Sequence, residues 1–229
     1  MEIRKIAEIK NGYTEKFGIP RQSGLANSVI SRIVFEPEYR VKEAFRDIEG
    51  YSHLWLIWEF SKAVREDWSP TVRPPRLGGN KRIGVFATRS PFRPNPIGLS
   101  SVRLERVELD SPEGPVLYVS GADLLNGTPI FDIKPYLPYT DSHPEALGGF
   151  AFGPGEGPVE VECAPALLAE VPAEKRQGLL ALLAQDPRPG YADDPERIYG
   201  MEYGGFEVKF RVNETLSVVA VQKTDGENK

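Results

Sequence analysis

The stretch HLWLIWEF, residues His53 to Phe60, is an almost unbroken apolar run with the length of a β-strand. Such a run predicts a strand that is buried on both faces or that lies at a contact between subunits. The residues alone leave both alternatives open. The run is the most strongly predicted element of the chain, and the elements on either side of it decide which fold it belongs to.

Short apolar segments surround this run. VISRIVF at 29–35 is rich in β-branched residues and predicts a strand, and the apolar spacing over 41–48 predicts a short amphipathic helix that ends at Gly50. Many short strands with turns between them are typical of a β-barrel or a sandwich. Further strands, separated by Gly, Pro and Asn, are predicted at 83–88, 102–109, 116–119 and 130–136.

The composition changes after a Gly- and Pro-rich loop at 138–158. A leucine-rich helix is predicted just after Pro172, and a closing hairpin at 205–212 and 216–222. The sequence therefore predicts a mainly β protein. We expect a β-barrel domain at residues 1–140, a Gly- and Pro-rich linker at 141–159 and a small α+β domain at 160–229.

Several classes of protein are disfavoured by the composition of the 229 residues. A single cysteine, Cys163, forbids an internal disulfide, and with only two histidines the sequence predicts no metal site. Neither a dinucleotide-binding glycine motif nor a phosphate-binding loop motif occurs. The start of the chain lacks a signal peptide, and no apolar stretch is long enough to span a membrane, so we expect a cytoplasmic protein without membrane association.

Charge is distributed unevenly along the chain. The net charge is −5, yet residues 69–104, the cationic segment, contain no acidic residue. Prolines and glycines interrupt this segment, so its side chains must be presented from loops. A solvated charged face usually mixes both signs, which makes that alternative weaker here. The cations are Arg73, Arg76, Lys81, Arg82, Arg89, Arg93 and Arg103, and the remainder of the chain carries −12.

Three segments have a composition that is unusual for structure alone: PRQSGL at 20–25, the stretch 73–100, and GADLLNGTPIFDIKPY at 121–136. Arginine can bind phosphate or carboxylate through two parallel hydrogen bonds, and prolines reduce the entropy that is lost on binding. The carboxylate and turn amides of the third segment suit the hydroxyls or amine of a nucleoside, although Asp and Asn in a turn often bond only their own backbone.

These three segments, with GYSHLWLIWEF at 50–60 and QDPRPGY at 185–191, resemble in order and spacing the tRNA adenosine N6-methyltransferase family called TrmO. The resemblance covers most of the first 140 residues and the later motif. It implies an S-adenosylmethionine-dependent methyltransferase with a β-barrel catalytic domain, which works as a homodimer on the anticodon loop of tRNA. The family substrate is N6-threonylcarbamoyl adenosine next to the anticodon. One departure is Asn126, where the family has Asp.

The resemblance also implies a cofactor site. Arg89 would bind the methionine carboxylate, Leu99 would cover the adenine, and Asp123 would accept hydrogen bonds from polar edges. The complete set of predicted cofactor contacts is Gln22, Ser23, Gly24, Ser61, Lys62, Arg89, Leu99, Ala122 and Asp123.

Catalysis requires loss of the proton on the target nitrogen, because the attached carbonyl deactivates that nitrogen. Tyr136 and Asp132 are the predicted proton acceptors. Two alternatives remain: an RNA-binding module without catalysis, and a small-molecule methyltransferase on the same barrel. The cations predicted to bind RNA are Arg73, Arg76, Lys81, Arg82 and Arg93.

Overall fold

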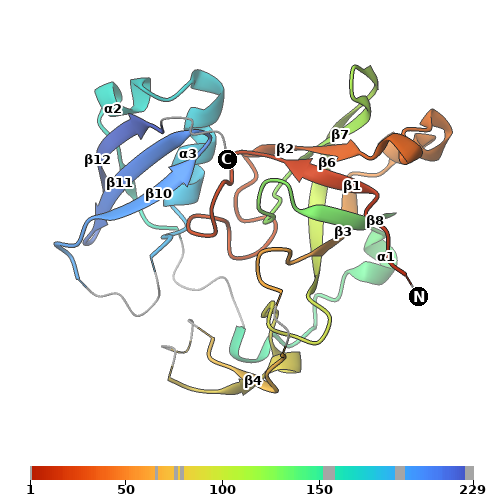
Figure 1. Cartoon of the computed structure of the whole chain (residues 1–229). Helices are drawn as coiled ribbons and strands as arrows, with labels where there is room; N and C mark the ends of the chain where they lie inside the picture. The colour runs from red at the N-terminus through yellow and green to blue at the C-terminus, as the bar shows by residue number, and fades with distance from the viewer. Residues whose placement is uncertain are drawn as a thin grey trace.

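Six antiparallel strands close into a barrel in the first part of the chain (Figure 1). The computed structural model describes residues 2–64, 67–74, 77, 80–151, 158–188 and 194–224. The strand order around the barrel is β1-β2-β7-β6-β3-β8, which confirms the predicted mainly β fold with a barrel. The strands are β1 (Ala7–Lys10), β2 (Ile30–Phe35), β3 (His53–Glu59), β6 (Ile97–Ser111), β7 (Gly114–Ser120) and β8 (Pro129–Pro135).

Strand β3 is buried on one face rather than on both. Leu54, Leu56 and Trp58 point into the barrel and are almost inaccessible, while the alternate residues are half-buried. The outer residue Trp55 is covered in part, since its Nε1 donates to Asp141 Oδ2 over 2.9 Å. This apolar outer face, covered in part by a segment far along the chain, explains why the sequence shows no alternation. It corrects the alternative of two fully buried faces, and the alternative of a contact between subunits stays a prediction.

Two other predicted elements are shorter or more irregular than expected. The segment predicted as one helix forms two 3₁₀ turns, Lys42–Phe45 and Ile48–Gly50, because Asp47 between them adopts a left-handed φ of 65°. The strand predicted at 83–88 is only β5 (Ile83–Gly84), which pairs with β4 (Thr71–Val72) and then turns into a 3₁₀ helix. Further 3₁₀ turns are Pro37–Tyr39, Val85–Ala87 and Gly149–Ala151.

A second sheet lies beside the barrel and follows a short helix α1 (Pro138–Asp141). Its strand order is β10-β11-β12-β9, and α3 contributes buried leucines to the core on one side of it. The predicted leucine-rich helix and closing hairpin are both present. The elements are β9 (Val161–Glu162), α2 (Pro165–Ala169), α3 (Ala173–Leu183), β10 (Tyr199–Tyr203), β11 (Phe206–Val212) and β12 (Leu216–Lys223).

The connection between β1 and β2, residues 11–29, leaves the barrel and packs against this second sheet. Tyr13, Ala26 and Val29 are buried in the same apolar cluster as Leu179 of α3 and Phe210 of β11. We call residues 11–29 the bridging loop. It belongs by sequence to the barrel and by packing to the second sheet. The barrel has its own apolar core, and the bridging loop ties it to the core of the second sheet.

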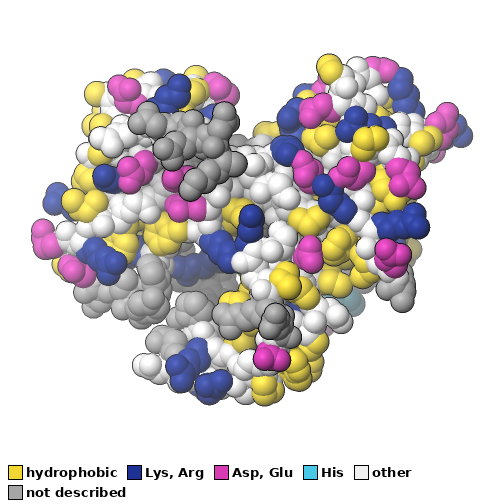
Figure 2. Space-filling view, viewed as in Figure 1, with side chains coloured by type: hydrophobic (Ala, Val, Ile, Leu, Met, Phe, Trp, Pro, Cys, Tyr) yellow, Lys and Arg dark blue, Asp and Glu magenta, His cyan; other side chains and the backbone are white. Residues whose placement is uncertain are grey.

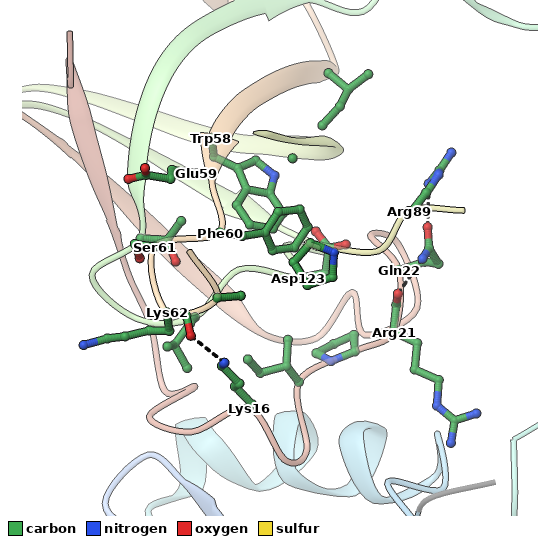
Figure 3. A pocket seen from close by; sticks show the side chains of 18 of the residues that line it. Lys16, Arg21, Gln22, Trp58, Glu59, Phe60, Ser61, Lys62, Arg89 and Asp123 are labelled. Carbon is green, nitrogen blue, oxygen red and sulfur yellow. Dashed lines mark hydrogen bonds between the residues drawn. The ribbon is translucent and has the colours of Figure 1, made fainter. Parts of the chain in front are cut away.

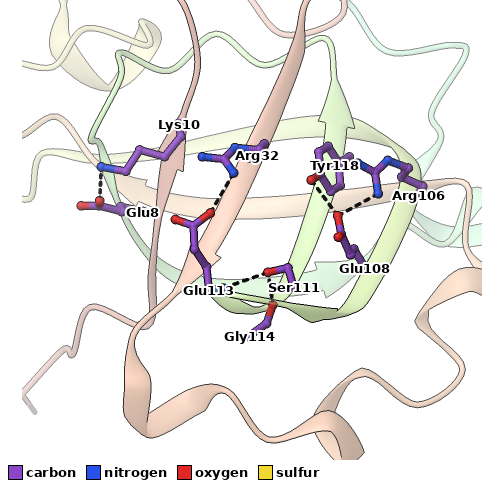
Figure 4. A network of polar contacts seen from close by, with 9 residues as sticks. All are labelled: Glu8, Lys10, Arg32, Arg106, Glu108, Ser111, Glu113, Gly114 and Tyr118. Atoms are coloured by element: carbon purple, nitrogen blue, oxygen red, sulfur yellow. Dashed lines mark hydrogen bonds and ion pairs between the residues drawn. The ribbon is translucent and has the colours of Figure 1, made fainter.

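Charged residues on the outside of the barrel are largely neutralised by each other. Arg32 on β2 pairs with Glu113 over 2.8 Å (Figure 4). Glu108 accepts hydrogen bonds from both Tyr118, over 2.8 Å, and Arg106, over 3.0 Å. Exposed pairs of this kind add little to stability, but they leave the barrel surface with little uncompensated positive charge.

Candidate functional site

A cavity of about 870 Å³ lies where the barrel, the bridging loop and the second domain meet (Figure 3). This volume is within the usual range for small-molecule sites. Six parts of the chain form its wall. From the barrel side these are Lys16–Gln22 of the bridging loop, Trp55 with Trp58–Ala63, Arg89 with Pro91–Arg93, Ile97–Leu99 of β6, and Asp123, Leu125 and Thr128 between β7 and β8. The sixth part is Leu182 of α3 with Gln185, Pro187 and Arg188 after it.

One side of the cavity is aromatic and closely packed. The rings of Trp58 and Phe60 lie 4.3 Å apart between centroids. Gly98 on β6 pairs with Trp58 on β3, and the indole lies directly on the glycine backbone: a Cβ at Gly98 would be 2.3 Å from Trp58 Cε2. Only glycine at this position leaves room for the indole, so the strand pairing itself fixes the aromatic wall.

A half-buried carboxylate lies beside the aromatic side. Asp123 accepts a hydrogen bond from Ser100 Oγ over 2.5 Å, and the backbone N–H of Ser23 also stabilises its charged form. Burial nevertheless raises the pKa of Asp123, against the effects of Ser100 and of the nearby Arg89 guanidinium. A carboxyl group held at the wall of a ligand-sized cavity is a typical acceptor for hydroxyl or amine donors of a ligand.

Arg89 is oriented by the bridging loop. Its Nη1–H donates to Gln22 Oε1 over 2.5 Å, which holds two predicted cofactor residues together beside Asp123 (Figure 3). The loop comes this close because Gly24 N–H donates to the carbonyl of Gly121 over 2.8 Å. Gly121 has a φ of 75°, and a Cβ there would lie 3.2 Å from the backbone of Gly24.

The structure brings most of the predicted cofactor residues to one place. Six line the cavity directly, namely Gln22, Ser61, Lys62, Arg89, Leu99 and Asp123. The other three lie behind the wall: Ser23 supports the Asp123 carboxylate through its backbone, Gly24 bonds Gly121, and Ala122 is buried in the barrel core.

The two predicted proton acceptors are not among the residues that line the cavity. Asp132 on β8 forms an ion pair with Lys134 over 2.9 Å. The Tyr136 ring packs against Trp55 with 5.5 Å between centroids, and Trp55 in turn lines the cavity. Asn126, where the sequence departs from the family pattern, accepts the backbone N–H of Asn11 over 3.0 Å and so supports the turn.

The cationic segment extends from the rim of the cavity. Arg89, residues 91–93 and residues 97–99 contribute to the cavity wall, and the β4–β5 ribbon before them carries the exposed side chains of Arg73, Lys81 and Arg82. None of these three pairs with a carboxylate in the described part of the chain, unlike Arg32 and Arg106 on the barrel. Arg103 lies further along β6, where it pairs with Glu105 over 3.6 Å. Figure 2 shows Lys and Arg side chains at the central hollow and on the lobe below it.

Two cations of this segment differ from the others. Arg93, which was predicted to bind RNA, is half-buried, lines the cavity and donates to the Thr88 carbonyl over 3.3 Å. Arg76 lies outside the described residues. Uncompensated cations beside a ligand-sized cavity favour a polyanionic partner whose reacting group enters that cavity.

Several cavity residues were not predicted from the sequence. Trp58 and Phe60 belong to the apolar run and were assigned to the core, whereas Leu182 and Gln185 come from the second domain. Ser100 could have been found, because it follows Gly98 by two residues on one strand and therefore faces the barrel interior. A polar residue at an inward position usually marks a site or a hydrogen-bond network.

Metal and membrane features are absent from the described residues. Within the ranges that the structure describes, no group of three or more His, Cys, Asp and Glu side chains is arranged to hold a metal ion. No helix in those ranges is long and apolar enough to cross a bilayer.

The barrel, its ligand-sized cavity and the exposed cations beside it are suited to a class of protein that acts on a small polar group of a polyanion. The chain belongs to the TrmO family. The family model for the tRNA-methyltransferase O N-terminal domain matches residues 8–142, and the model for the TrmO C-terminal domain matches residues 156–224.

Similar proteins from two bacteria cover most of the chain. A tRNA (adenine(37)-N6)-methyltransferase of Escherichia coli K12 is 41% identical, covering 93% of this chain and 94% of that protein. A protein of Pseudomonas aeruginosa described as a putative S-adenosylmethionine-dependent methyltransferase is 42% identical over 90% of each chain. The crystal structure of TrmO from P. aeruginosa has a TM-score of 0.79 and 34% identity, with 97% of each chain covered.

Proposed function

We propose that this protein transfers a methyl group from S-adenosylmethionine to N6 of threonylcarbamoyl adenosine next to the anticodon of tRNA. The observation that carries the proposal is the cavity: Arg89, Gln22 and Asp123 line it together with Trp58 and Phe60, and the cationic segment continues outward from its rim. Family membership and the activities for which the relatives are named support the same reaction.

The cavity fits the cofactor in chemical terms. S-adenosylmethionine has three parts that the cavity could bind: a carboxylate, hydroxyl and amine donors, and a base. The cavity offers an arginine for the carboxylate, a carboxyl group for the donors and aromatic side chains for the base. The bound cofactor supplies the methyl electrophile. Arg89 and Gln22 would bind the carboxylate, Leu99 would cover the adenine, and Asp123 would accept hydrogen bonds. The closely packed walls would exclude water from the target nitrogen.

The proton on the target nitrogen needs an acceptor. We propose Tyr136 or Asp132 for this role. Tyr136 packs against Trp55, so it would approach the target nitrogen from the side of the cavity that Trp55 lines. The neighbouring cations would stabilise the negative charge that develops on the nitrogen. Single-turnover methylation by Tyr136→Phe and by Asp132→Asn, with cofactor affinity measured in parallel, separates a loss of proton transfer from a loss of binding.

The proposal also includes the domain bounds and the assembly. A barrel domain at 1–140 and a domain at 160–229, joined by a linker at 141–159, agree with the positions of the two sheets. We place the enzyme in the cytoplasm, where its proposed tRNA substrate is modified.

A homodimer is the proposed state in solution. Large apolar side chains stay exposed in the monomer, including Phe86 at 72%, Tyr139 at 87% and Leu147 at 94%. Covering such side chains in a dimer would remove apolar surface from water. Analytical ultracentrifugation at micromolar concentration is expected to show a species of twice the 25.5 kDa chain mass. A single species of the chain mass would contradict the dimer and leave the fold unaffected.

The experiment that tests the function has two arms. S-adenosylmethionine at about 100 times its dissociation constant should stabilise the protein by about 2.7 kcal/mol, which a thermal shift detects. Incubation with bulk tRNA from a strain that lacks the enzyme, followed by nucleoside mass spectrometry, should yield N6-methylated threonylcarbamoyl adenosine. Cofactor binding without methylated tRNA would indicate a small-molecule methyltransferase, and tRNA binding without cofactor binding would indicate an RNA-binding module.

The β4–β5 ribbon is expected to carry part of the affinity for tRNA. Replacing Arg73, Lys81 and Arg82 together by alanine should lower the slope of log affinity against log salt concentration by about 0.7–0.9 for each phosphate that is no longer neutralised. Filter binding over a range of salt concentrations measures this slope. The matched control replaces Arg32, Arg106 and Lys42, whose charges are already paired on the barrel. Equal slopes for both triple variants would place the tRNA-binding surface elsewhere.

A further inference from the structure

Three side chains form a continuous hydrogen-bond chain behind the cavity wall. The Trp58 Nε1–H donates to Ser100 Oγ over 2.9 Å, and Ser100 Oγ donates to Asp123 Oδ1 over 2.5 Å. Trp58 and Asp123 line the cavity, whereas Ser100 lies behind them and is 1% exposed. The serine therefore connects the aromatic wall to the carboxylate wall without itself being part of the lining.

The chemistry of the three groups fixes the direction of this chain. An indole N–H can only donate, and a serine hydroxyl has one proton and two acceptor positions. Because Ser100 accepts from Trp58, its single proton is free to be directed to Asp123. Oδ1 of Asp123 is then an acceptor, which is the role of an ionised carboxylate. The arrangement favours the charged form of Asp123 in a place where burial disfavours it.

The first member of the chain cannot easily move. The Trp58 indole lies on the Gly98 backbone on one side and near the Phe60 ring, 4.3 Å between centroids. A fixed indole fixes the position of Ser100, and Ser100 in turn fixes one oxygen of Asp123. The rotation of the carboxyl group is thereby restricted before any ligand binds, which reduces the entropy lost on binding.

We propose that Ser100 is a positioning residue, which holds Asp123 ionised and oriented so that it can accept a hydroxyl or ammonium donor of the cofactor. This inference rests on the proposed function for the identity of the ligand, S-adenosylmethionine. It adds a residue that does not touch the ligand, and it assigns Trp58 a second role as the donor that directs the serine proton.

Removing the Ser100 hydroxyl should weaken cofactor binding in a pH-dependent way. A hydrogen bond to a charged group is removed, so Ser100→Ala should raise the dissociation constant of S-adenosylmethionine at least tenfold in calorimetry. The titratable groups that face Asp123 are the Arg89 guanidinium and the Tyr13 phenol. Burial raises the pKa of Tyr13, so its phenol stays neutral, and Asp123 is the acid on this wall whose charge changes as the pH falls.

Loss of the Ser100 hydroxyl should shift the pH dependence of cofactor affinity to higher pH. Affinity should fall when the pH drops through the pKa of Asp123, because the protonated acid is a poorer acceptor. Ser100 lowers that pKa, so in Ser100→Ala the pKa is higher and affinity should begin to fall at a higher pH. Ser100→Thr keeps the hydroxyl and should restore most of the affinity and the original pH profile.

Ser120 provides a matched control. It is also 1% exposed, it donates to the Glu105 carboxylate over 2.5 Å, and it does not line the cavity. Ser120→Ala should leave cofactor affinity and its pH profile unchanged. An equal loss in both alanine variants, or wild-type affinity and pH dependence in Ser100→Ala, would overturn the proposal.

The pKa of Asp123 can be measured without cofactor, which tests the role of Ser100 independently of the proposed function. NMR titration of the Asp123 carboxyl carbon should show a higher pKa in Ser100→Ala than in the wild-type protein, and an unchanged pKa would overturn the proposal. If the wild-type protein bound no S-adenosylmethionine, the proposed function would fail while this titration still decided the role of Ser100. If Ser100→Ala did not fold, Ser100→Cys, with a weaker donor of similar size, should raise the same pKa.

Discussion

Replacing Gly98 by alanine is expected to destabilise the protein by about 3 kcal/mol and to disrupt the cofactor cavity. The added Cβ would lie 2.3 Å from Trp58 Cε2, so either the indole or strand β6 must move. Overpacking of a closely packed core commonly costs about 1–3 kcal/mol, and here the Phe60 ring and the Ser100 hydroxyl also hold the displaced indole. Urea denaturation should show a lower midpoint with an unchanged slope.

The control for this effect is Gly84→Ala on β5. A Cβ at Gly84 meets no atom within 4 Å, and its φ is −56°, which any residue can adopt. Gly84→Ala should therefore keep the wild-type stability to within about 0.5 kcal/mol. A Gly98→Ala protein with the stability of Gly84→Ala would show that the indole has another place to lie, and that the aromatic wall is not fixed by strand pairing.

Replacing Arg89 by alanine should weaken S-adenosylmethionine binding by about tenfold to more than a hundredfold. Arg89 lies at the cavity rim, held by Gln22, and a charge-assisted hydrogen bond to the cofactor carboxylate contributes about 1.5–3 kcal/mol. Arg89→Lys should recover only part of this affinity, because an ammonium group cannot form two parallel hydrogen bonds to a carboxylate. Isothermal calorimetry measures all three proteins.

Arg82→Ala is the matched control for Arg89→Ala. Arg82 lies on the β4–β5 ribbon, where its Nε donates to Thr71 Oγ1 over 2.8 Å, and it does not line the cavity. The two variants should have opposite effects: Arg82→Ala loses tRNA affinity and keeps cofactor affinity, whereas Arg89→Ala does the reverse. Wild-type cofactor affinity in Arg89→Ala with a large loss of tRNA binding would assign Arg89 to the RNA surface.

The barrel could be predicted because its strands are short, apolar and separated by turn residues. The beginning of β6 was missed for a physical reason. Gly98 and Ser100 occupy inward positions where a core strand would have large apolar side chains, because the indole of Trp58 fills the space over Gly98. Hydrophobicity therefore indicated a strand only from Val102 onward, although pairing with β3 begins at Ile97.

The candidate site was predictable where local motifs carry it and not where distant segments meet. The order and spacing of PRQSGL and ATRSPFRPNP indicated Gln22 and Arg89, which the structure joins by a hydrogen bond. The contribution of Leu182 and Gln185 depends on the packing of α3 against the bridging loop, which no local pattern reports. The outward face of β3 was misjudged because its cover, Asp141 over Trp55, lies 86 residues away.

The bridging loop links the unfolding of the barrel to the unfolding of the second sheet. Tyr13, Ala26 and Val29 are buried among residues of α3 and the second sheet, and Gly204 N–H donates to the carbonyl of Gly12 over 2.9 Å. Unfolding of the second sheet therefore exposes apolar side chains of the loop that joins β1 to β2. We expect denaturation to be a single cooperative event for the whole chain, in which a ligand that binds at the cavity protects α3 as well as the barrel.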